Sequence, residues 1–309
     1  MQQIKRKHHY VWKEYLKSWS NNDQVFAFLK STKKLIKSNT EGVGQERFFY
    51  GLEVFTEEEE IVLKELVESW SNDSVREINL EFYHIFTSYS KIKRALTNKD
   101  LSTIDNEKLK HQLDLLKANT MEESHTIIEA FGKKLIKISK FEDLRFLEET
   151  NELLSTMIYI SFQYLRTRNM REIIKPIMPK YSYLSEKFLN IFPFIYATAI
   201  ADSLTHKKTV RFIYLNNQTD VDFITSDQPI INEKKHILND EGTVAQLNFY
   251  YPIHPGIALV IHYQEQQEKY KYVNIEKLEV EKYNLLMFNN AREFVFATSE
   301  DQLILYNGL

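Results

Sequence analysis

The feature that most constrains the fold of this chain is a change of hydrophobic pattern near residue 207. From residue 56 to about residue 207 the apolar residues recur with a helical period, whereas short β-branched and aromatic runs follow Lys208. Two further short strands, at 25–29 and 34–36, precede the helical region and are expected to form a hairpin. The sequence therefore predicts an α+β fold, with a largely helical middle and an N-terminal β-hairpin that packs with a C-terminal antiparallel sheet.

The helical pattern divides into candidate helices at 57–70, 74–96, 105–118, 121–140, 141–169 and 180–206. The later part of the chain is expected to form strands at 210–215, 221–225, 245–249, 258–263 and 294–298 and a helix at 275–291. We find no internal repeat or low-complexity linker. We therefore treat residues 1–309 as a single α+β domain, with a hairpin region (1–55), a helical region (56–207) and a β-rich region (208–309).

The first long helix carries a start signal. Thr56 and Glu59 have the spacing of a capping box, in which a hydroxyl and a carboxylate each satisfy a free amide at the helix end. Acidic residues in the first turn also suit the helix dipole. The run Glu57–Glu60 is thus expected to be structural, because neighbouring carboxylates on a helix do not converge on a metal ion.

Composition excludes several classes of site. The chain has no cysteine, so disulfides, thiolate nucleophiles and cysteine-based zinc sites are ruled out. Only 7 glycines argue against glycine-rich phosphate loops. The formal charge of −3 gives no overall bias toward nucleic acid or membranes. Residues 1–37 are basic and either attract a polyanion or form an ordinary solvated surface.

No targeting segment is visible at the N-terminus, because its charged residues are not followed by an apolar stretch. No apolar run reaches the roughly 18 residues that span a bilayer. The longest, 188–200, is interrupted by Asn190 and Pro193 and is expected to be a buried helix. We expect a soluble, cytoplasmic protein without a membrane partner.

Two polar motifs lie about two hundred residues apart. The first is His8-His9-Tyr10-Val11, followed by Tyr15-Leu16-Lys17 and Trp19, and the second lies within Phe223–Ile230. Each places ionisable side chains beside aromatic or β-branched residues at an expected turn. If the N-terminal hairpin joins the C-terminal sheet, His9 and Asp227 approach one another.

These segments resemble the DUF4238 family, bacterial proteins without an assigned function. The family's His-Tyr-Val-Pro start is similar to His9-Tyr10-Val11-Trp12, and its Thr-Ser-Asp-x-Pro signature is similar to Thr225-Ser226-Asp227-Gln228-Pro229. Its Gln-x-x-Arg-Thr segment resembles Gln163-Tyr164-Leu165-Arg166-Thr167, and its Tyr-Pro-x-x-Pro turn resembles Tyr251-Pro252-Ile253-His254-Pro255. An asparagine on the last helix resembles Asn284. The resemblance runs from about residue 5 to about residue 300.

One departure from the family pattern concerns the N-terminal turn. Trp12 stands where the family has proline, so the turn into the first helix lacks the fixed φ of a proline. That difference leaves the loop geometry near His9 open.

Different roles are expected for the two N-terminal histidines. His8 is expected to be exposed. His9 is either a general base or metal ligand, or a residue that bonds backbone and holds the N-terminus in place. Its Lys and Arg neighbours are expected to lower its pKa and keep the ring neutral.

The second motif also has two interpretations. Asp227 can close an Asx-type turn through its carboxylate, or it can orient His9 or bind a divalent cation while Ser226 contacts a phosphate. Ser226 lacks the flanking glycines of a nucleophile elbow, so a serine hydrolase is not expected.

Helical spacing places Gln163 and Arg166 on one face, three residues apart. Arg166 can bind a phosphate bidentately or pair with one of the many glutamates. His125 and Glu129 also share a face, but no second helix carries matching metal ligands.

Our leading hypothesis is phosphodiester cleavage, of RNA in particular, in an effector of phage defence. His9 is assigned as general base, Asp227 as its orienting group or the holder of a divalent cation, and Arg166 as the group that stabilises charge on phosphate. Substrate-binding roles are assigned to Gln163, Ser226, Tyr15 and Lys17. The alternative is a non-enzymatic protein that binds a partner protein, a ligand or a second copy of itself, in which the same cluster is structural.

Overall fold

The computed structural model describes residues 4–5, 7–47, 49–70, 72–97, 106–176, 186–206, 210–240, 242, 244–263 and 268–306. The first elements are β1 (Lys7–His9), α1 (Lys13–Leu16), β2 (Gln24–Leu29), β3 (Lys34–Asn39) and β4 (Gln45–Arg47). The helical region contains α2 (Glu57–Glu68), α3 (Asp73–Thr97), α4 (Asn106–Phe131), α5 (Thr150–Leu165), α6 (Arg168–Ile174) and α7 (Phe188–His206). The last part contains β5 (Val210–Asn217), β6 (Thr225–Ser226), β7 (Ile231–Asn232), β8 (Asn248–His254), β9 (Ile257–Tyr263), β10 (Tyr270–Ile275), α8 (Lys277–Asn290), β11 (Phe294–Ala297) and α9 (Glu300–Ile304).

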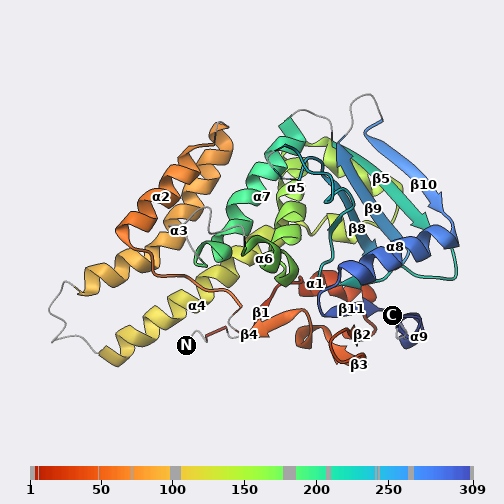
Figure 1. Cartoon of the computed structure of the whole chain (residues 1–309), viewed down its shortest axis with the longest axis horizontal. Helices are drawn as coiled ribbons and strands as arrows, with labels where there is room; N and C mark the ends of the chain where they lie inside the picture. The colour runs from red at the N-terminus through yellow and green to blue at the C-terminus, as the bar shows by residue number, and fades with distance from the viewer. Residues whose placement is uncertain are drawn as a thin grey trace.

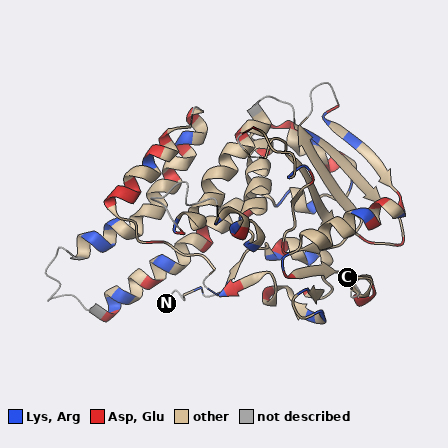
Figure 2. Ribbon diagram, viewed as in Figure 1, with Lys and Arg blue, Asp and Glu red and all other residues tan. Residues whose placement is uncertain are grey.

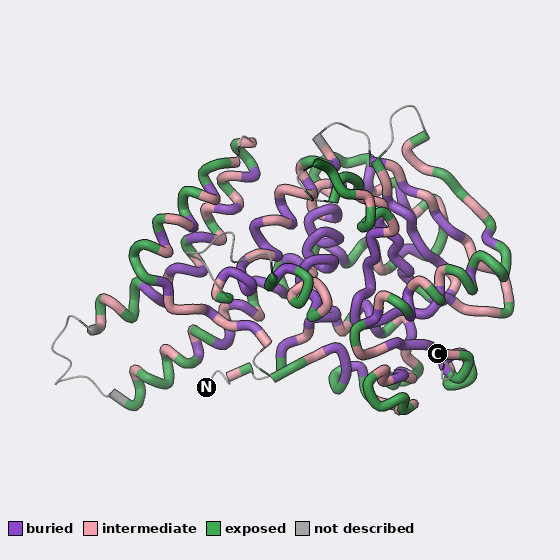
Figure 3. The backbone as a smooth tube through the Cα atoms, viewed as in Figure 1, coloured by how far each residue is buried: buried purple, intermediate pink, exposed green. Residues whose placement is uncertain are grey.

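The helices α5 and α7 stand at the centre of the molecule. An arm formed by α2, α3 and α4 extends to one side of them, and the sheets lie on the other side (Figure 1). Lys, Arg, Asp and Glu are frequent along the arm, whereas the central helices are mostly free of them (Figure 2). The central helices and the middle strands of the larger sheet are also the most buried part of the chain (Figure 3). The core therefore runs from the central helices into the sheet.

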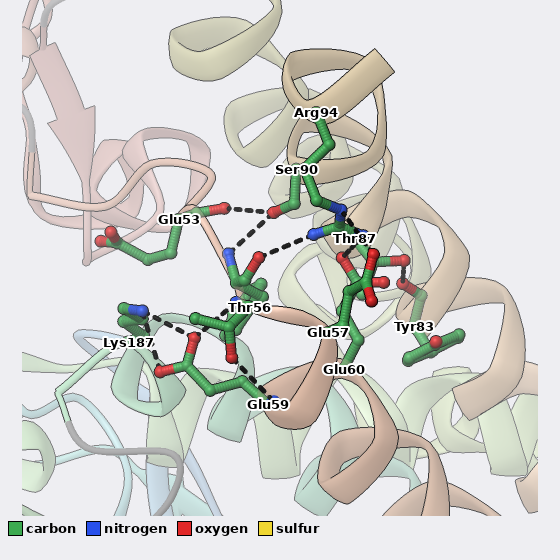
Figure 4. A network of polar contacts seen from close by, with 11 residues as sticks. Glu53, Thr56, Glu57, Glu59, Glu60, Tyr83, Thr87, Ser90, Arg94 and Lys187 are labelled. Carbon is green, nitrogen blue, oxygen red and sulfur yellow. Dashed lines mark hydrogen bonds and ion pairs between the residues drawn. The ribbon is translucent and has the colours of Figure 1, made fainter. Parts of the chain in front are cut away.

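The start of α2 confirms the predicted capping box. Thr56 Oγ1 accepts from the Glu59 amide at 3.2 Å, and Glu59 Oε2 accepts from the Thr56 amide at 2.8 Å. The Glu59 carboxylate also binds Lys187 Nζ, and Glu60 Oε1 binds Arg94 Nη2 at 2.7 Å (Figure 4). The acidic run thus ties α2 to α3 and to the residue before α7, which is the structural role expected for it.

The N-terminal hairpin joins the C-terminal part of the chain in one four-stranded sheet, ordered β3-β2-β11-β6. β11 pairs antiparallel with β2 on one side and with β6 on the other. The predicted closure of the two ends is therefore confirmed. Because Asp227 directly follows β6, it lies at this joint, where its amide donates to the Phe294 carbonyl at 2.9 Å.

The second sheet has five strands in the order β10-β5-β9-β8-β7. Phe249 and Tyr251 of β8 face the main core with α5 and α7, since the Tyr159 and Tyr251 hydroxyls meet at 2.7 Å. Tyr250 points to the opposite face and stacks on Tyr283 of α8, with ring centroids 4.3 Å apart. The sheet is not purely antiparallel as expected, because β10 runs parallel to β5.

α7 is long and apolar enough, by length and composition, to cross a membrane over Phe188–Thr205, and 61% of that stretch is buried within the protein. Asn79 of α3 donates to the Ile195 carbonyl of α7 at 3.3 Å. These features are those of the buried core helix predicted for this segment.

Several predicted boundaries are wrong for tertiary reasons. The expected helices 105–118 and 121–140 are one helix, α4, whose Asn119 side chain accepts from the Lys5 amide at 2.9 Å. α4 ends near Gly132, where a Cβ would lie 2.7 Å from the Tyr159 ring. The expected helix 141–169 is divided into a 3-10 helix, α5 and α6, because Glu149 and Thr167 adopt extended backbone angles. The strand β10 was not predicted, and α7 begins at Phe188.

Candidate functional site

The N-terminal motif is held by a short two-stranded ladder. β1 pairs antiparallel with β4, with His9 opposite Gln45. The amides of Tyr10 and Val11 both donate to the Gly44 carbonyl, at 3.0 and 3.1 Å. Gly44 has φ +61°, and a Cβ there would lie 3.0 Å from the Val11 Cβ, so this position requires glycine. The ladder fixes the backbone from His9 to Val11.

Trp12 keeps the geometry that a proline would impose. It precedes α1 with φ −60° and ψ 123°, and proline is locked near φ −65°. Its ring is buried and packs edge-on against Tyr159, with centroids 5.5 Å apart. The turn near His9 is therefore retained without proline, and the indole contributes packing to the core.

The Tyr10 carbonyl receives the two polar side chains predicted to share a helix face. Gln163 Nε2 and Arg166 Nε each donate to it at 3.1 Å. Both side chains are buried, and Arg166 is 3% exposed. The N-terminal motif thus meets the end of α5 as expected, but the contact is made to the Tyr10 carbonyl and not to the His9 side chain.

Arg166 has two further partners on α4. Its Nη1 lies 3.2 Å from His125 Nδ1, and its Nη2 lies 2.7 Å from Glu129 Oε1. The predicted common face of His125 and Glu129 is real, but the two side chains bind the guanidinium. Among the described residues, no group of three or more His, Asp or Glu side chains is arranged to hold a metal ion.

Tyr50 forms the centre of a stack of three rings. Its ring lies 4.5 Å from the His8 ring and 3.8 Å from the His125 ring, with interplanar angles of 14° and 12°. The Tyr50 amide donates to His8 Nδ1 at 3.2 Å, and its hydroxyl donates to Glu122 Oε2 at 2.7 Å. His8, which was expected to be exposed, is fully buried in this stack.

Burial controls the protonation of the three histidines. It lowers the pKa of His8, His9 and His125, and Arg166 lowers the pKa of His9 and His125 further. Burial also raises the pKa of Tyr50. His9 is half-buried, and its Nε2 atom is buried without a hydrogen-bond partner. The expected direction of the His9 shift is confirmed, although burial is its main cause.

We expect this arrangement to make the fold sensitive to acid. A histidine whose pKa is lowered on folding adds stability above its unfolded value of about 6.5, and that stability is lost as the pH falls below it. His125→Gln should therefore reduce the slope of unfolding free energy against pH by up to about 1.4 kcal/mol per pH unit between pH 6 and 5. Urea titrations at several pH values measure this slope. His111→Gln on the same helix is the control, and an unchanged slope in His125→Gln would contradict the prediction.

The Asp227 carboxylate is bound entirely by backbone. Its Oδ1 accepts from the Arg292 amide at 2.8 Å, and its Oδ2 accepts from the Glu293 and Phe294 amides at 2.7 and 3.1 Å. Burial raises the pKa of Asp227 to about 6, although the three amides lower it. The carboxylate accepts backbone amides as expected, but they belong to residues 292–294 and not to an Asx-type turn of its own segment. Among the described contacts, none joins its carboxylate to His9.

Ser226 and Gln228 complete this joint. Ser226 Oγ accepts from the Gln228 amide at 3.1 Å, and Gln228 Nε2 donates to the Tyr164 carbonyl at 3.2 Å. Thr167, directly after Arg166, donates its hydroxyl to Gln228 Oε1. The second motif is thereby connected to the end of α5, as the first motif is through Tyr10.

The other two predicted substrate-binding residues lie in different surroundings. Tyr15 is fully buried, and its hydroxyl donates to the Pro252 carbonyl at 2.7 Å and lies 2.7 Å from Thr225 Oγ1. Lys17 is at the surface and pairs with Glu14 at 3.0 Å. Tyr15 thus connects the first motif to the second, and Lys17 faces solvent.

Comparison with known protein families shows to which family the chain belongs. Residues 7–301 match the family described as a protein of unknown function, DUF4238. The chain belongs to the DUF4238 family. The resemblance seen in its motifs is confirmed over nearly the whole of its length. No curated protein and no solved structure matches the chain.

Two spaces of very different size lie near Tyr50, and only the smaller is lined by residues of a DUF4238 motif, Leu165 and Arg166. Beside Arg166 and His125 there is a hollow of about 20 Å³, closed by Phe49, Tyr50 and Asn190 among others. Next to it lies a cleft of about 660 Å³, which we call the N-terminal cleft. Its lining comes from Ile4, Phe49, Tyr50, Gly51, Glu53, Asp114, Lys117, Ala118, Arg171 and Asn190. Tyr50 lines both spaces, whereas His125 and Arg166 line only the smaller one.

The sequence did not indicate the partners of Arg171 and Asn190, which shape this region. Arg171 Nη1 donates to the Phe49 carbonyl at 3.2 Å and to Asn190 Oδ1 at 2.8 Å. Asn190 in turn donates to the Gly51 carbonyl at 3.2 Å and to Glu53 Oε1 at 2.9 Å. The one available signal was the polar Asn190 within an apolar helix, since a buried amide needs partners.

Proposed function

We propose that this DUF4238 protein is a non-enzymatic binding protein that takes a peptide segment of a partner protein in the N-terminal cleft. The observation that carries the proposal is the difference in size between the two spaces, about 20 Å³ beside Arg166 and about 660 Å³ in the cleft. The smaller volume suits about one water molecule, whereas ligand sites in proteins span about 300–1,000 Å³. A ligand of useful size fits the cleft and not the hollow.

The polar contacts favour the structural interpretation of the motif residues. Phosphodiester cleavage by His9, Asp227 and Arg166 would need these side chains to reach a phosphate or its attacking group. Both Asp227 oxygens are occupied by amides, and Arg166 is bound to Glu129 and the Tyr10 carbonyl, whereas His9 Nε2 is buried without a hydrogen-bond partner. Buried groups with their partners satisfied are typical of structural clusters. These contacts support the second of the two sequence-based hypotheses.

The charges around the cleft indicate the kind of ligand. Lys117 and Arg171 contribute positive charge to the lining, and Glu53 and Asp114 contribute negative charge. Balanced charges attract a polyanion such as RNA little, because nucleic-acid sites depend on an excess of Lys and Arg. The half-buried ring of Phe49 adds an apolar contact between the charged positions. A peptide segment with both charges and an apolar side chain matches this lining.

A variant that fills the cleft tests the proposal. A Cβ added at Gly51 would meet only the Lys117 carbonyl, at an ordinary contact distance of 3.5 Å, so Gly51→Phe should fold and occupy the cleft. We expect the wild type to enrich specific sequences from a displayed library of short random peptides, and Gly51→Phe to bind the enriched peptides at least tenfold more weakly. Lys117→Glu should change which charged residues are selected. Fluorescence anisotropy with the enriched peptides measures both effects.

Two further measurements decide against the alternatives. Lys110 is an exposed residue of α4, the helix that also carries Lys117, and it lies outside the cleft. Lys110→Glu should therefore leave peptide binding unchanged. Failure to enrich any peptide that distinguishes the wild type from Gly51→Phe would overturn the proposal. Cleavage of single-stranded RNA by the wild type, abolished in His9→Ala at unchanged thermal stability, would overturn it in favour of the nuclease hypothesis.

A further inference from the structure

A second and larger space lies on the other half of the molecule, at one end of the five-stranded sheet. It has a volume of about 920 Å³ and we call it the sheet cleft. Strands β5, β8 and β9, the end of α7 and the segment before β8 all contribute to its lining. Its apolar side chains are Leu204, Ile213, Val244, Leu247, Val260 and Tyr263. A volume and lining of this kind are typical of a site for a small organic ligand.

Strand register explains why apolar side chains face this space. Ile213 of β5 lies opposite Val260 of β9, and His262, two residues further along β9, lies opposite Asn248 of β8. Because side chains alternate along a strand, these four point to the same face of the sheet. The neighbouring Phe212 and Phe249 point to the other face and are fully buried in the main core. The face of Phe212 and Phe249 packs against the main core, and the opposite face carries a second core, whose residues Ile213 and Val260 also line the cleft at this end of the sheet.

The segment before β8 that lines the cleft is held in place by Asn232. Its Oδ1 accepts from the Lys234 amide at 3.0 Å and from the Asn248 amide at 2.9 Å. Its Nδ2 donates to the Gln246 carbonyl at 3.0 Å. Asn232 is 1% exposed, so these bonds are protected from water. The backbone at Lys234 and at 246–248, on one side of the cleft, is therefore fixed before any ligand arrives.

The charge of the lining has one sign. Lys234 and His262 are the ionisable side chains other than tyrosine among the described residues of the lining, and none of those residues carries a carboxylate. Glu233, the residue before Lys234, lies at the edge of the lining, where its Oε2 accepts from Asn248 Nδ2 at 3.0 Å. Burial lowers the pKa of His262, which favours its neutral form as a hydrogen-bonding group. An anionic group would find the Lys234 ammonium and the imidazole of His262 here, and the Glu233 carboxylate is already bonded to Asn248.

We propose that the sheet cleft binds a small amphipathic carboxylate, with its hydrocarbon part against Ile213, Leu247 and Val260 and its carboxylate at Lys234 and His262. The site is separate from the N-terminal cleft and does not depend on the function proposed for it. Burial of each additional CH₂ group against an apolar wall strengthens binding by about fourfold. The length of the hydrocarbon chain should therefore control affinity until the cleft is full.

Isothermal titration with butyrate, hexanoate and octanoate, each below its micelle concentration, tests this inference on the full chain. We expect affinity to rise about fourfold for each added CH₂ group. Octylamine and octanol should bind at least tenfold more weakly than octanoate. Lys234→Met should weaken octanoate binding at least tenfold, and Ala245→Phe, at an exposed residue of the lining, should abolish it.

Matched variants on the same segment control for the substitutions. Lys235→Met and His236→Gln change neighbouring exposed residues outside the lining and should leave octanoate affinity unchanged. Equal binding of octylamine and octanoate would overturn the inference. So would the absence of any dependence on chain length, or wild-type affinity in Lys234→Met.

Discussion

Arg166→Met is expected to lower the free energy of unfolding by about 3–5 kcal/mol. The substitution removes the guanidinium that binds Glu129, the Tyr10 carbonyl and His125. Methionine fills much of the same space but leaves the Glu129 carboxylate and the His125 imidazole nitrogen in a buried site without this partner, and the Tyr10 carbonyl keeps only Gln163 as a donor. Loss of one partner from a buried ion pair costs far more than the net value of the pair itself. Urea denaturation followed by circular dichroism measures the change.

A nearby arginine provides the matched control. Arg168 has a side chain 47% exposed, with Glu46 at 3.7 Å and Glu172 at 3.6 Å. Exposed ion pairs of this kind contribute about 0–1 kcal/mol, so Arg168→Met should be nearly neutral. Arg166→Met combined with Glu129→Leu should recover part of the loss, because both charges are then removed together. A loss below about 1 kcal/mol in Arg166→Met would contradict the structural role and reopen the functional one.

The experiment separates the two hypotheses drawn from the sequence. A residue that acts on substrate can be replaced with loss of activity and little loss of stability, since active sites are often not optimised for stability. A residue that joins the parts of a fold loses stability first. Arg166 joins the N-terminal motif to α4 and α5, and it lies beside a hollow of about 20 Å³. The geometry therefore places the expected effect in folding.

The fold was predictable where local patterns decide it. The capping box at Thr56, the hairpin β2–β3 and the helical pattern of α2 and α3 each depend on residues close in sequence, and each is confirmed. The errors arise where distant residues decide. α4 continues through Asn119 because the Lys5 amide donates to the Asn119 side chain. β10 forms because the edge of β5 is available to pair with it. Neither contact leaves a signal in the local sequence.

In the candidate site, too, contacts between residues close in sequence were predictable and contacts between distant residues were not. Spacing three apart correctly placed Gln163 and Arg166 together, and spacing four apart placed His125 and Glu129 together. The stacking of Tyr50 between His8 and His125 joins three segments far apart in the chain. No pattern in one sequence indicates such a contact, because any buried aromatic ring could serve. Which side chains share a helix face was therefore easier to predict than which distant residues they contact.

Asp227→Ala is expected to lower the free energy of unfolding by about 2–4 kcal/mol at pH 7, because three amide donors lose their acceptor. The three amides, of Arg292, Glu293 and Phe294, lie at the start of β11. β11 is the strand that joins the N-terminal hairpin to β6. Loss of the carboxylate should thus loosen the joint between the two ends of the chain. Asp220→Ala removes an exposed carboxylate that pairs with Lys277 at 2.8 Å, and it should cost less than about 1 kcal/mol.

The pH dependence of this loss gives a second readout. Burial raises the pKa of Asp227 to about 6 in the folded state, above the ordinary value of 3.8. A raised pKa means that the proton-linked stability is present below about pH 3.8 and is lost as the pH rises through about 6. The cost of Asp227→Ala should therefore be larger at pH 5 than at pH 7, by about 1 kcal/mol. A cost that shrinks toward pH 5 would mean that the three amides outweigh burial and that the joint depends on the ionised carboxylate.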